Sequence, residues 1–575
     1  MAKGRIILWI ALLAGSAVLA TGAQNAAQSE DGSAFAPLQL GAVSNFSQGL
    51  PHRFAATAAD LGITNFRDGM VWRQVEERPG VFTFDGPRVN FPDAVADAGA
   101  TVSLTIHWGN PLYDEGFTPH SPEALAAQQP FTRAILERFP KVDTIEVGNE
   151  FNGTTFVSGP VREMNVDGRA AAHVAILKEI YEAAQSAGRE ITVLGGATHS
   201  IPTRYIWDIL DAGGAEIMDA IAIHPYSTTP EQFGKQIAVM RRHPDAKDLP
   251  IQVTEFGTRN IEGAPAFFLK WIAVMAVNGV ERAVWYPLTA RQDGYEPLMD
   301  REGALTPVGE AFAFAQQHLA GRNAHDVSPD AYTFAVRFGE YALVLWGAPR
   351  SVRLADGITA FGPTGAPLAA SGLSVSADTP IILLSEEIPV ALGNTVTLGP
   401  QTLLADSFFD FAYPDPEAAP VSAADGPLTF LAQRDGAEIP LTTQAGQDRG
   451  GVPWNPYLSG DRLFPLVLTS RTMVPRAGRP AAEVVARYDA PADGPVDVVA
   501  HFVPSERTED GVSLTVTLNG TVLAETAGTT QLSFADQVAL SAGDRLAFAL
   551  GPNGTQKGDA TRYRITIAKP GMLLR

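Results

Sequence analysis

The chain of 575 residues contains no cysteine, which excludes disulfide bonds, thiol nucleophiles and thiolate metal sites. Its hydrophobic content of 45% is enough to fill more than one core. A chain of this length is expected to form two to four domains. Their stability must come from packing alone.

Basic residues are also few. The sequence has 42 Lys and Arg against 63 Asp and Glu, a formal net charge of -21. Such a surface repels nucleic acid and anionic lipid, so we expect neither as a partner. The charge does not select a substrate, and the sequence does not reveal the oligomeric state.

Long apolar runs are absent after the N-terminus. Lys3 and Arg5 precede an apolar run from Ile6 to about Ala20, and small residues continue to Ala23. This pattern predicts a signal peptide over residues 1–23 and a secreted or periplasmic protein. An uncleaved anchor is the alternative, although the run is shorter than the roughly 20 residues that a spanning helix needs. We expect no membrane partner beyond export.

Between residues 36 and 321, short apolar runs alternate with segments of helical period. This alternation is typical of parallel strands joined by crossover helices. Eight pairs in this length predict a (β/α)8 barrel, an α/β fold. The expected strands are 38–46, 64–72, 101–110, 142–150, 191–200, 219–227, 250–258 and 281–289.

After Gly321 the pattern changes to strands of period two, beginning with the hairpin "YTFAVRFGEYALVLWG". We expect a β-sandwich accessory domain over 322–400, packed on the barrel. Residues 401 to about 480 are rich in Pro, Gly and Asp, and strands resume at about 482. Residues 401–575 are therefore expected to form a C-terminal β-sandwich, for which carbohydrate binding is one candidate role.

Polar and aromatic residues gather where the barrel strands end, the face at which such barrels carry their active sites. Glu150 ends the fourth strand and Glu255 the seventh, so the two can face each other across the mouth although 105 residues separate them (255 - 150). Two carboxyl groups about 5 to 5.5 Å apart are what a retaining glycosidase requires. The other candidates at strand ends are Arg67, His107, Trp108, Asn149, His224, Tyr226 and Trp285.

The segments "VGNEFNG", "QVTEFG", "AIHPYS" and "AVWYPL" resemble the strand ends of glycoside hydrolase clan A. The export signal, the appended β region and "FRDG" most resemble family 39 and related bacterial exopolysaccharide glycosidases. The resemblance implies Glu150 as acid/base, Glu255 as nucleophile and Asn149 as the partner of the sugar 2-hydroxyl. It also implies Arg67 and Tyr226 as the groups that orient Glu255, and a chemistry that needs no metal or other cofactor.

The two roles require opposite protonation states of the two carboxyl groups. Arg67 and Tyr226 are expected to keep Glu255 ionised, whereas a second negative charge and partial burial are expected to raise the pKa of Glu150 so that it keeps its proton. Trp285 is the expected sugar-stacking platform. His107 and His224 have two interpretations, as substrate contacts or as core histidines bonded to the loop backbone.

The sequence therefore predicts an exported retaining glycoside hydrolase that acts on a polysaccharide or oligosaccharide, with endo action favoured. Loops that block one end of the cleft would make it exo-acting instead. The main alternative is a non-catalytic glycan-binding or scaffold protein on a degenerate barrel. A barrel of unrelated chemistry, such as an aldolase, lacks a Lys at a strand end and a phosphate-binding glycine cluster.

Overall fold

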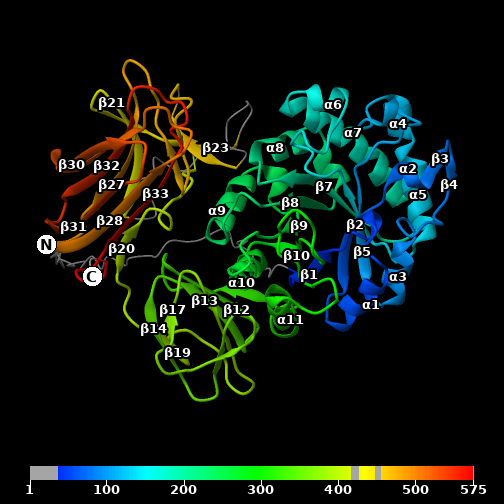
Figure 1. Ribbon diagram of the computed structural model, residues 1–575, viewed down its shortest axis with the longest axis horizontal. Coiled ribbons are helices and arrows are strands. Elements are labelled where there is room, and N and C mark those ends of the chain that lie inside the picture. Colours follow the sequence, from blue (N-terminus) through cyan, green and yellow to red (C-terminus); the bar gives the residue numbers. More distant parts are fainter. Residues whose placement is uncertain (1–35, 416–426, 447–454, 461, 574–575) are drawn as a thin grey trace, which may run out of the picture.

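The computed structural model describes residues 36–415, 427–446, 455–460 and 462–573. The expected signal peptide over residues 1–23 lies outside these ranges. Within them, no helix has the length and hydropathy required to cross a bilayer. Figure 1 shows a barrel and two β-sandwiches arranged around it.

Eight parallel strands close into a barrel, which confirms the predicted α/β fold class. Around the barrel the strands follow the order β1-β10-β9-β8-β7-β6-β5-β2. Barrel strands that are consecutive in the sequence therefore pair with each other, and the first strand, β1, closes the barrel against the last, β10. The strands are β1 (Gln39–Val43), β2 (Asn65–Gly69), β5 (Thr101–Ile106), β6 (Thr144–Val147), β7 (Thr192–His199), β8 (Ala220–His224), β9 (Ile251–Phe256) and β10 (Val280–Trp285). A short hairpin, β3 (Glu76–Arg78) and β4 (Val81–Phe82), lies in the connection after β2.

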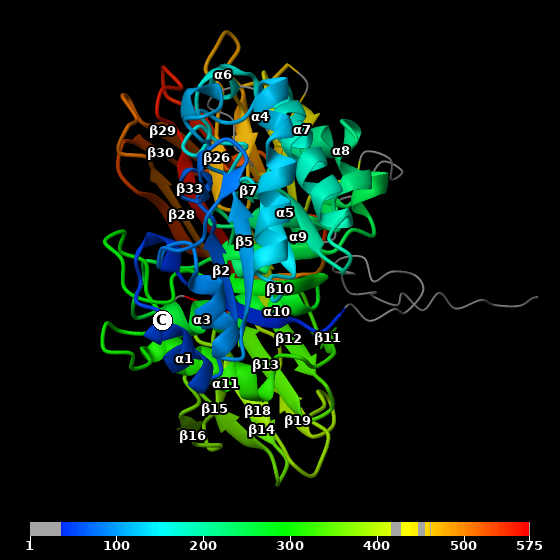
Figure 2. The same cartoon turned by 90° about the vertical axis from the view of Figure 1, so that its right-hand side faces the viewer.

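Helices surround the barrel and bury their apolar faces against it (Figure 2). The main ones are α1 (Arg53–Asp60), α3 (Phe91–Asp97), α5 (Gln128–Arg138), α7 (Val166–Gln185), α8 (Thr203–Asp211), α9 (Pro230–Met240), α10 (Ala264–Ala276) and α11 (Pro307–His318). The shorter α2 (Trp72–Val75), α4 (Pro122–Ala126) and α6 (Pro160–Glu163) lie in the longer connections. This arrangement leaves the carboxyl ends of the strands to the loops, which build the mouth.

Two antiparallel sheets form a middle sandwich over residues 324–398. One contains β11 (Ala324–Asp326), β12 (Thr333–Phe338), β13 (Ala342–Gly347), β18 (Ile381–Leu384), β15 (Thr359–Phe361) and β16 (Pro367–Leu368). The other contains β17 (Ser374–Val375), β14 (Arg350–Leu354) and β19 (Val396–Leu398).

Strand β13 is buried on both faces. Val344 and Trp346 belong to the core that the sheet shares with the barrel, whereas Leu343 and Leu345 belong to the core inside the sandwich. Because side chains alternate along a strand, one strand serves both cores. The middle sandwich is therefore fixed to the barrel by a continuous apolar interface.

A second sandwich, the C-terminal sandwich, contains all the later strands described (Figure 1). One sheet is built from β23 (Thr442–Gln444), β24 (Tyr457–Ser459), β25 (Val467–Leu468), β26 (Thr472–Val474), β33 (Thr561–Ala568), β28 (Gly494–Pro504) and β31 (Leu532–Leu540), with β20 (Leu403–Asp406) paired to β33. The facing sheet is built from β22 (Ala437–Pro440), β21 (Leu428–Arg434), β27 (Glu483–Asp489), β32 (Arg545–Pro552), β29 (Val512–Leu518) and β30 (Thr521–Gly528). One separate apolar core lies between these sheets.

Helix α9 holds the segment that leads into the C-terminal sandwich. Side chains of α9 and the turn after it donate to backbone carbonyls of residues 408–414: Gln232 to Phe408, Lys235 to Phe409 and Phe411, and Arg242 to Tyr413 and Pro414. Val239 of α9 also belongs to the core of this sandwich. The barrel and the C-terminal sandwich are thus joined by both polar and apolar contacts.

We expect Trp346→Ala to lower the free energy of unfolding by about 3–5 kcal/mol, because it opens a cavity in the shared core. Urea unfolding of the full chain measures the change. Tyr341→Ala is the matched control on the same hairpin, since Tyr341 is 39% exposed, and should stay within about 0.5 kcal/mol of the parent. Equal effects of the two variants would contradict the shared core.

Candidate active site

Arg67 is the central cation of the barrel mouth. It lies on β2, is 4% exposed, and contacts three partners with three different nitrogens. Nε donates to Glu146 Oε2 at 2.5 Å, Nη1 to Glu255 Oε1 at 2.5 Å and Nη2 to Asn149 Oδ1 at 2.9 Å. Burial alone would lower the pKa of Arg67, but the two carboxylates raise it above its usual value. The guanidinium therefore stays charged and fixes the positions of all three partners.

Glu146 on β6 is a fully buried carboxylate that the sequence analysis missed. Its Oε2 accepts from Arg67 and from Thr105 Oγ1 at 2.9 Å, and its Oε1 accepts from Thr254 Oγ1 at 2.7 Å. Burial would raise the pKa of Glu146, but Arg67 and His224 lower it below the usual range. An ionised buried carboxylate is tolerated only when it is paired and hydrogen-bonded in this way.

Glu255 on β9 has a partner on each carboxylate oxygen. Oε1 accepts from Arg67, and Oε2 accepts from the Tyr226 hydroxyl at 3.0 Å. The side chain of Glu255 is 15% exposed, so the carboxylate is still accessible. Burial and the Glu255 charge raise the pKa of Tyr226 well above its usual value, which keeps the phenol protonated as a donor.

Glu150 follows β6 in a tight turn. Gly148 has φ 80° and Glu150 itself has φ 45°, a left-handed conformation that costs a non-glycine residue about 1–2 kcal/mol. The turn brings Glu150 Oε1 within 3.3 Å of His224 Nδ1. The strained backbone therefore lies at Glu150 itself, the residue whose carboxyl group faces His224.

His224 is fully buried and lies between the carboxylates. Its Nε2 lies 3.0 Å from Thr254 Oγ1, whose hydroxyl donates to Glu146, so Nε2 carries a hydrogen. Its Nδ1 faces Glu150 and also lies 3.9 Å from Glu255 Oε2. Burial would lower the pKa of His224, but Glu255, Glu146 and Glu150 raise it to about 9. His224 is therefore an imidazolium at neutral pH and a buried ion partner, not an exposed substrate contact.

The positive charge of His224 reverses the direction of the pKa shift expected for Glu150. Burial would raise the pKa of Glu150, but the hydrogen bond and charge of His224 lower it below its ordinary value. The second carboxylate and burial alone predict a raised pKa for Glu150, but the contact with His224 outweighs both. Glu150 is therefore ionised in the resting site.

Glu150, His224 and Glu255 each offer one ligand atom, and these atoms lie within 4.8 Å of one another. Among the described residues this is the one cluster compact enough for a metal ion. A metal ion there would need the neutral imidazole of His224, in place of the proton that the neighbouring carboxylates favour. What the cluster provides is two closely spaced carboxylates.

Asn149 is 6% exposed, and its amide has a defined orientation. Because Oδ1 accepts from Arg67, the NH2 group is left to donate to another partner. A hydroxyl oxygen bound beside Glu255 can accept a hydrogen bond from this NH2 group.

Trp285 does not form the expected stacking platform. It is 0% exposed, and Phe256, Phe267 and Phe268 surround its ring. Its Nε1 donates to the carbonyl of Glu296 at 2.9 Å. Trp285 therefore supports the loop after β10 from inside the core.

Tyrosines line this side of the mouth instead. The ring of Tyr295, on the loop after β10, lies 5.4 Å from the rings of both Tyr226 and Tyr286. Burial and nearby carboxylates, among them Glu150 and Glu255, raise the pKa of Tyr295. Tyr295 is therefore an aromatic candidate at the site that the strand-end rule could not find, because it lies ten residues beyond β10.

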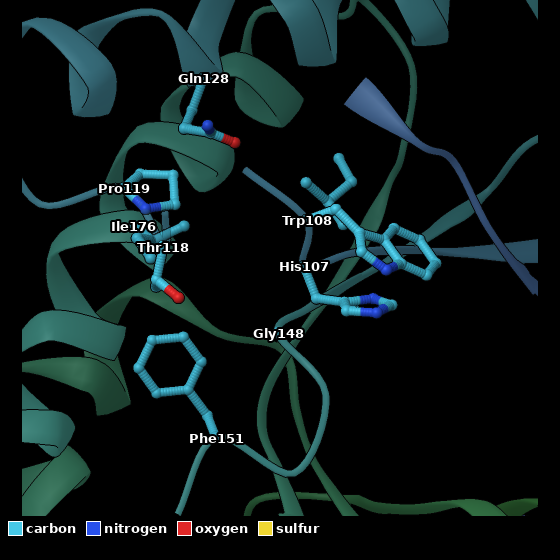
Figure 3. Close-up of a pocket in the computed structure, with 9 residues that line it drawn as sticks. His107, Trp108, Thr118, Pro119, Gln128, Gly148, Phe151 and Ile176 are labelled. Atoms are coloured by element: carbon cyan, nitrogen blue, oxygen red, sulfur yellow. The ribbon is translucent and has the colours of Figure 1, made fainter. Parts of the chain in front are cut away.

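His107 and Trp108 follow β5 and line a small cavity between the strand ends and helices α5 and α7 (Figure 3). Its space of about 10 Å³ is room for one water molecule. His107 Nδ1 and Gln128 Nε2 are buried there without a hydrogen-bond partner in the described chain. Burial and Arg67 lower the pKa of His107 to about 3, so this ring is neutral. His107 and Trp108 are both half-buried, and His107 Nδ1 does not form the loop-backbone bond that the core interpretation expects.

His199 ends β7 and was not among the predicted candidates. Its ring is half-buried and lies 6.4 Å from that of Tyr226, nearly parallel to it. The same strand-end rule that found Glu150 and Glu255 could have found His199. In the fifth strand only small residues precede the histidine, so its end carries a weaker signal than the ends of the fourth and seventh strands.

No protein-family model and no curated protein sequence matches this chain. Solved structures do match. A family 39 glycoside hydrolase from the gut symbiont Bacteroides cellulosilyticus WH2 is 18% identical, with a TM-score of 0.50, over 61% of this chain and 81% of that one. A family 30 endoxylanase from Clostridium papyrosolvens C71 is 10% identical, with a TM-score of 0.46, over 63% and 98% of the two chains.

A family 5 glycoside hydrolase from Streptomyces cattleya, solved in complex with GlcNAc, is 17% identical with a TM-score of 0.39, over 50% of this chain and 80% of that one. At these identities the likeness concerns the fold. The chain has the barrel fold seen in clan A glycoside hydrolases, as the sequence resemblance implied.

The charge of His224 predicts a pH-dependent contribution to stability. A pKa raised from 6.5 to about 9 on folding corresponds to about 3 kcal/mol. This contribution is fully present below pH 6.5 and is lost as the pH rises through 9. The difference in unfolding free energy between the parent and His224→Gln should therefore shrink over this range. Urea unfolding at a series of pH values measures it.

His243→Gln is the matched control, since His243 pairs with Asp211 at 3.2 Å near the surface. That variant should show little change over the same pH range. A His224→Gln difference that does not vary with pH would contradict the imidazolium assignment.

Proposed function

We propose that this protein is an exported retaining glycoside hydrolase that cleaves a polysaccharide or oligosaccharide by double displacement. The observation that carries the proposal is the approach of Glu150 and Glu255 to within 4.8 Å, each held by different partners. A separation of about 5 Å suits direct attack by one carboxylate, whereas inverting enzymes need about 6.5–9.5 Å to admit a water molecule.

In the first step, Glu255 attacks the anomeric carbon. Arg67 and Tyr226 hold its two oxygens, so little reorientation is needed when the covalent bond forms. The free NH2 group of Asn149 donates to a sugar hydroxyl beside the reacting carbon.

Glu150 protonates the leaving oxygen in the same step. Because Glu150 is ionised at rest, its proton comes from His224, the cation whose Nδ1 lies 3.3 Å from Oε1. Substrate binding removes water from the site, which disfavours the charge pair and drives the proton onto Glu150.

In the second step, Glu150 is the base that activates water against the glycosyl-enzyme. Once Glu255 is esterified, its negative charge near His224 is gone. The imidazole can then remain neutral after its proton has left, and Glu150 accepts the proton of the attacking water. The second displacement restores the original configuration at the sugar carbon.

The substrate we propose is an extracellular polysaccharide cleaved internally. Apolar side chains of the loops after β5 and β6 are exposed, among them Phe117 at 39% and Phe156 at 40%. Together with Tyr295 on the opposite loop they offer aromatic contacts on two sides, as binding of several sugar units requires. The C-terminal sandwich would hold the polymer near the barrel, and secretion or periplasmic export would bring the enzyme to it.

Replacing Glu255 by Gln should abolish hydrolysis of every glycan that the parent cleaves, because the amide cannot act as the nucleophile. A panel of purified polysaccharides, assayed for released reducing ends, tests this. Glycan affinity should be retained, since the side chain keeps its shape. Glu262→Gln on the exposed loop after β9 is the matched control and should leave the rate unchanged. Full activity of Glu255→Gln would overturn the nucleophile assignment.

Glu150→Ala should reduce turnover by about 10²–10⁴-fold, with the largest loss on substrates that have poor leaving groups. Azide should restore part of the rate on activated substrates, because a small anion can replace the base-activated water. Chromatography of the azide-treated reaction would show a glycosyl azide. Equal loss for good and poor leaving groups, without rescue, would argue against an acid/base role.

The product should form with the same anomeric configuration as the substrate. Proton NMR recorded within the first minutes of hydrolysis distinguishes the two anomers before mutarotation mixes them. Initial formation of the inverted anomer would contradict double displacement.

A further inference from the structure

The side chain of Asn455, which belongs to the C-terminal sandwich, lies at the barrel mouth. Asn455, two residues before β24, contacts the ends of two barrel strands. Its Oδ1 accepts from the Ile201 backbone N–H at 2.8 Å, and its Nδ2 lies 3.1 Å from both Ser227 Oγ and Thr228 Oγ1. Nearby, the Arg204 N–H donates to the carbonyl of Ala445 at 2.8 Å. In Figure 1, β23 accordingly lies beside α8.

From Ser227 a short series of hydrogen bonds leads to His199. Ser227 Oγ donates to Ser200 Oγ at 2.6 Å, and Ser200 Oγ lies 2.8 Å from His199 Nδ1. We call Asn455, Ser227, Ser200 and His199 the relay. It joins the C-terminal sandwich to a half-buried ring at the mouth.

The donors and acceptors of the relay can be satisfied in one direction. The Asn455 NH2 group only donates, so Ser227 Oγ accepts from it and directs its own hydrogen to Ser200. The hydrogen of Ser200 is then available for His199 Nδ1. Thr228 cannot reverse this order, because its hydroxyl donates to Gln236 Oε1 at 2.6 Å.

This direction sets the tautomer of His199. With Nδ1 as an acceptor, the ring carries its hydrogen on Nε2. Nε2 has no partner among the described residues, and the backbone of His199 is held on both sides by Asn152, whose side chain bonds its N–H at 2.9 Å and its carbonyl at 3.0 Å. The ring also lies against Tyr226, which contacts Glu255.

We propose that the C-terminal sandwich completes the active site, with Asn455 and the two serines holding His199 so that its Nε2–H donates to a hydroxyl oxygen of the bound sugar. Asn455 is a positioning residue and His199 the substrate contact. The ligand contact rests on the proposed glycosidase function, whereas the tautomer does not. On this account, removal of Asn455 affects sugar binding in the barrel although Asn455 belongs to another module.

The first measurement is independent of catalysis. In protein labelled with ¹⁵N-histidine, the His199 signals are assigned by their loss in His199→Gln. The parent should show a protonated Nε2 and an unprotonated Nδ1. Ser200→Ala, which interrupts the relay without changing the contacts of Asn455, should give a mixture of tautomers. So should Asn455→Asp, which keeps the acceptor for Ile201 but loses the NH2 donor.

The second measurement uses glycans that the parent cleaves. Asn455→Asp and Ser200→Ala should weaken glycan binding in the Glu255→Gln background by about 3–10-fold, the effect of one neutral hydrogen bond. In the active enzyme KM should rise by a similar factor, with a smaller change in kcat. Asn553→Ala is the matched control, since Asn553 is bonded to the Asp510 carbonyl within the C-terminal sandwich, and it should leave both values unchanged.

The outcomes separate the two proposals. A protonated Nδ1 in the parent, or a tautomer unchanged by both relay variants, overturns the relay whatever the enzyme does. The expected tautomers with unchanged glycan affinity overturn the ligand contact and leave Asn455 a structural link. Absence of hydrolysis with any glycan counts against the proposed function, while the tautomer result still decides the relay.

Discussion

The buried guanidinium of Arg67 is the contact on which the geometry of the mouth depends. One planar cation holds Glu146, Glu255 and Asn149, which come from two strands far apart in the sequence. A lysine could not replace it, because only the forked guanidinium reaches three acceptors in fixed directions. Glu146 in turn keeps Thr105 and Thr254 oriented, so the ion pair extends into the barrel interior. Each charge at the mouth is held by more than one partner, since Tyr226 also bonds Glu255 and His224 lies between the carboxylates.

The barrel could be predicted from the sequence because each strand and helix carries a local pattern. The same holds for Glu150 and Glu255, since the end of a parallel strand is recognisable without knowledge of its neighbours. What could not be predicted was the environment of each group. His224 lowers the pKa of Glu150 through a 3.3 Å contact across 74 residues, and no local pattern contains that information.

The errors at Trp285 and Glu146 have a common physical origin. A tryptophan at a strand end can turn toward the mouth or into the core, and three phenylalanines from β9 and α10 determine that it turns inward. Glu146 sits among the apolar residues of β6, where a charge is unexpected unless its partners are known. In both cases burial is set by residues distant in the sequence.

Helix α9 forms hydrogen bonds to the middle sandwich and to the segment that enters the C-terminal sandwich. Glu231 accepts from the indole of Trp346 in the middle sandwich, while Gln232 and Lys235 hold the segment that enters the C-terminal one. This helix follows β8, the strand that ends in His224. Both sandwiches therefore contact the N-terminal half of the helix that follows His224, and the appended modules help to hold the end of β8 in place.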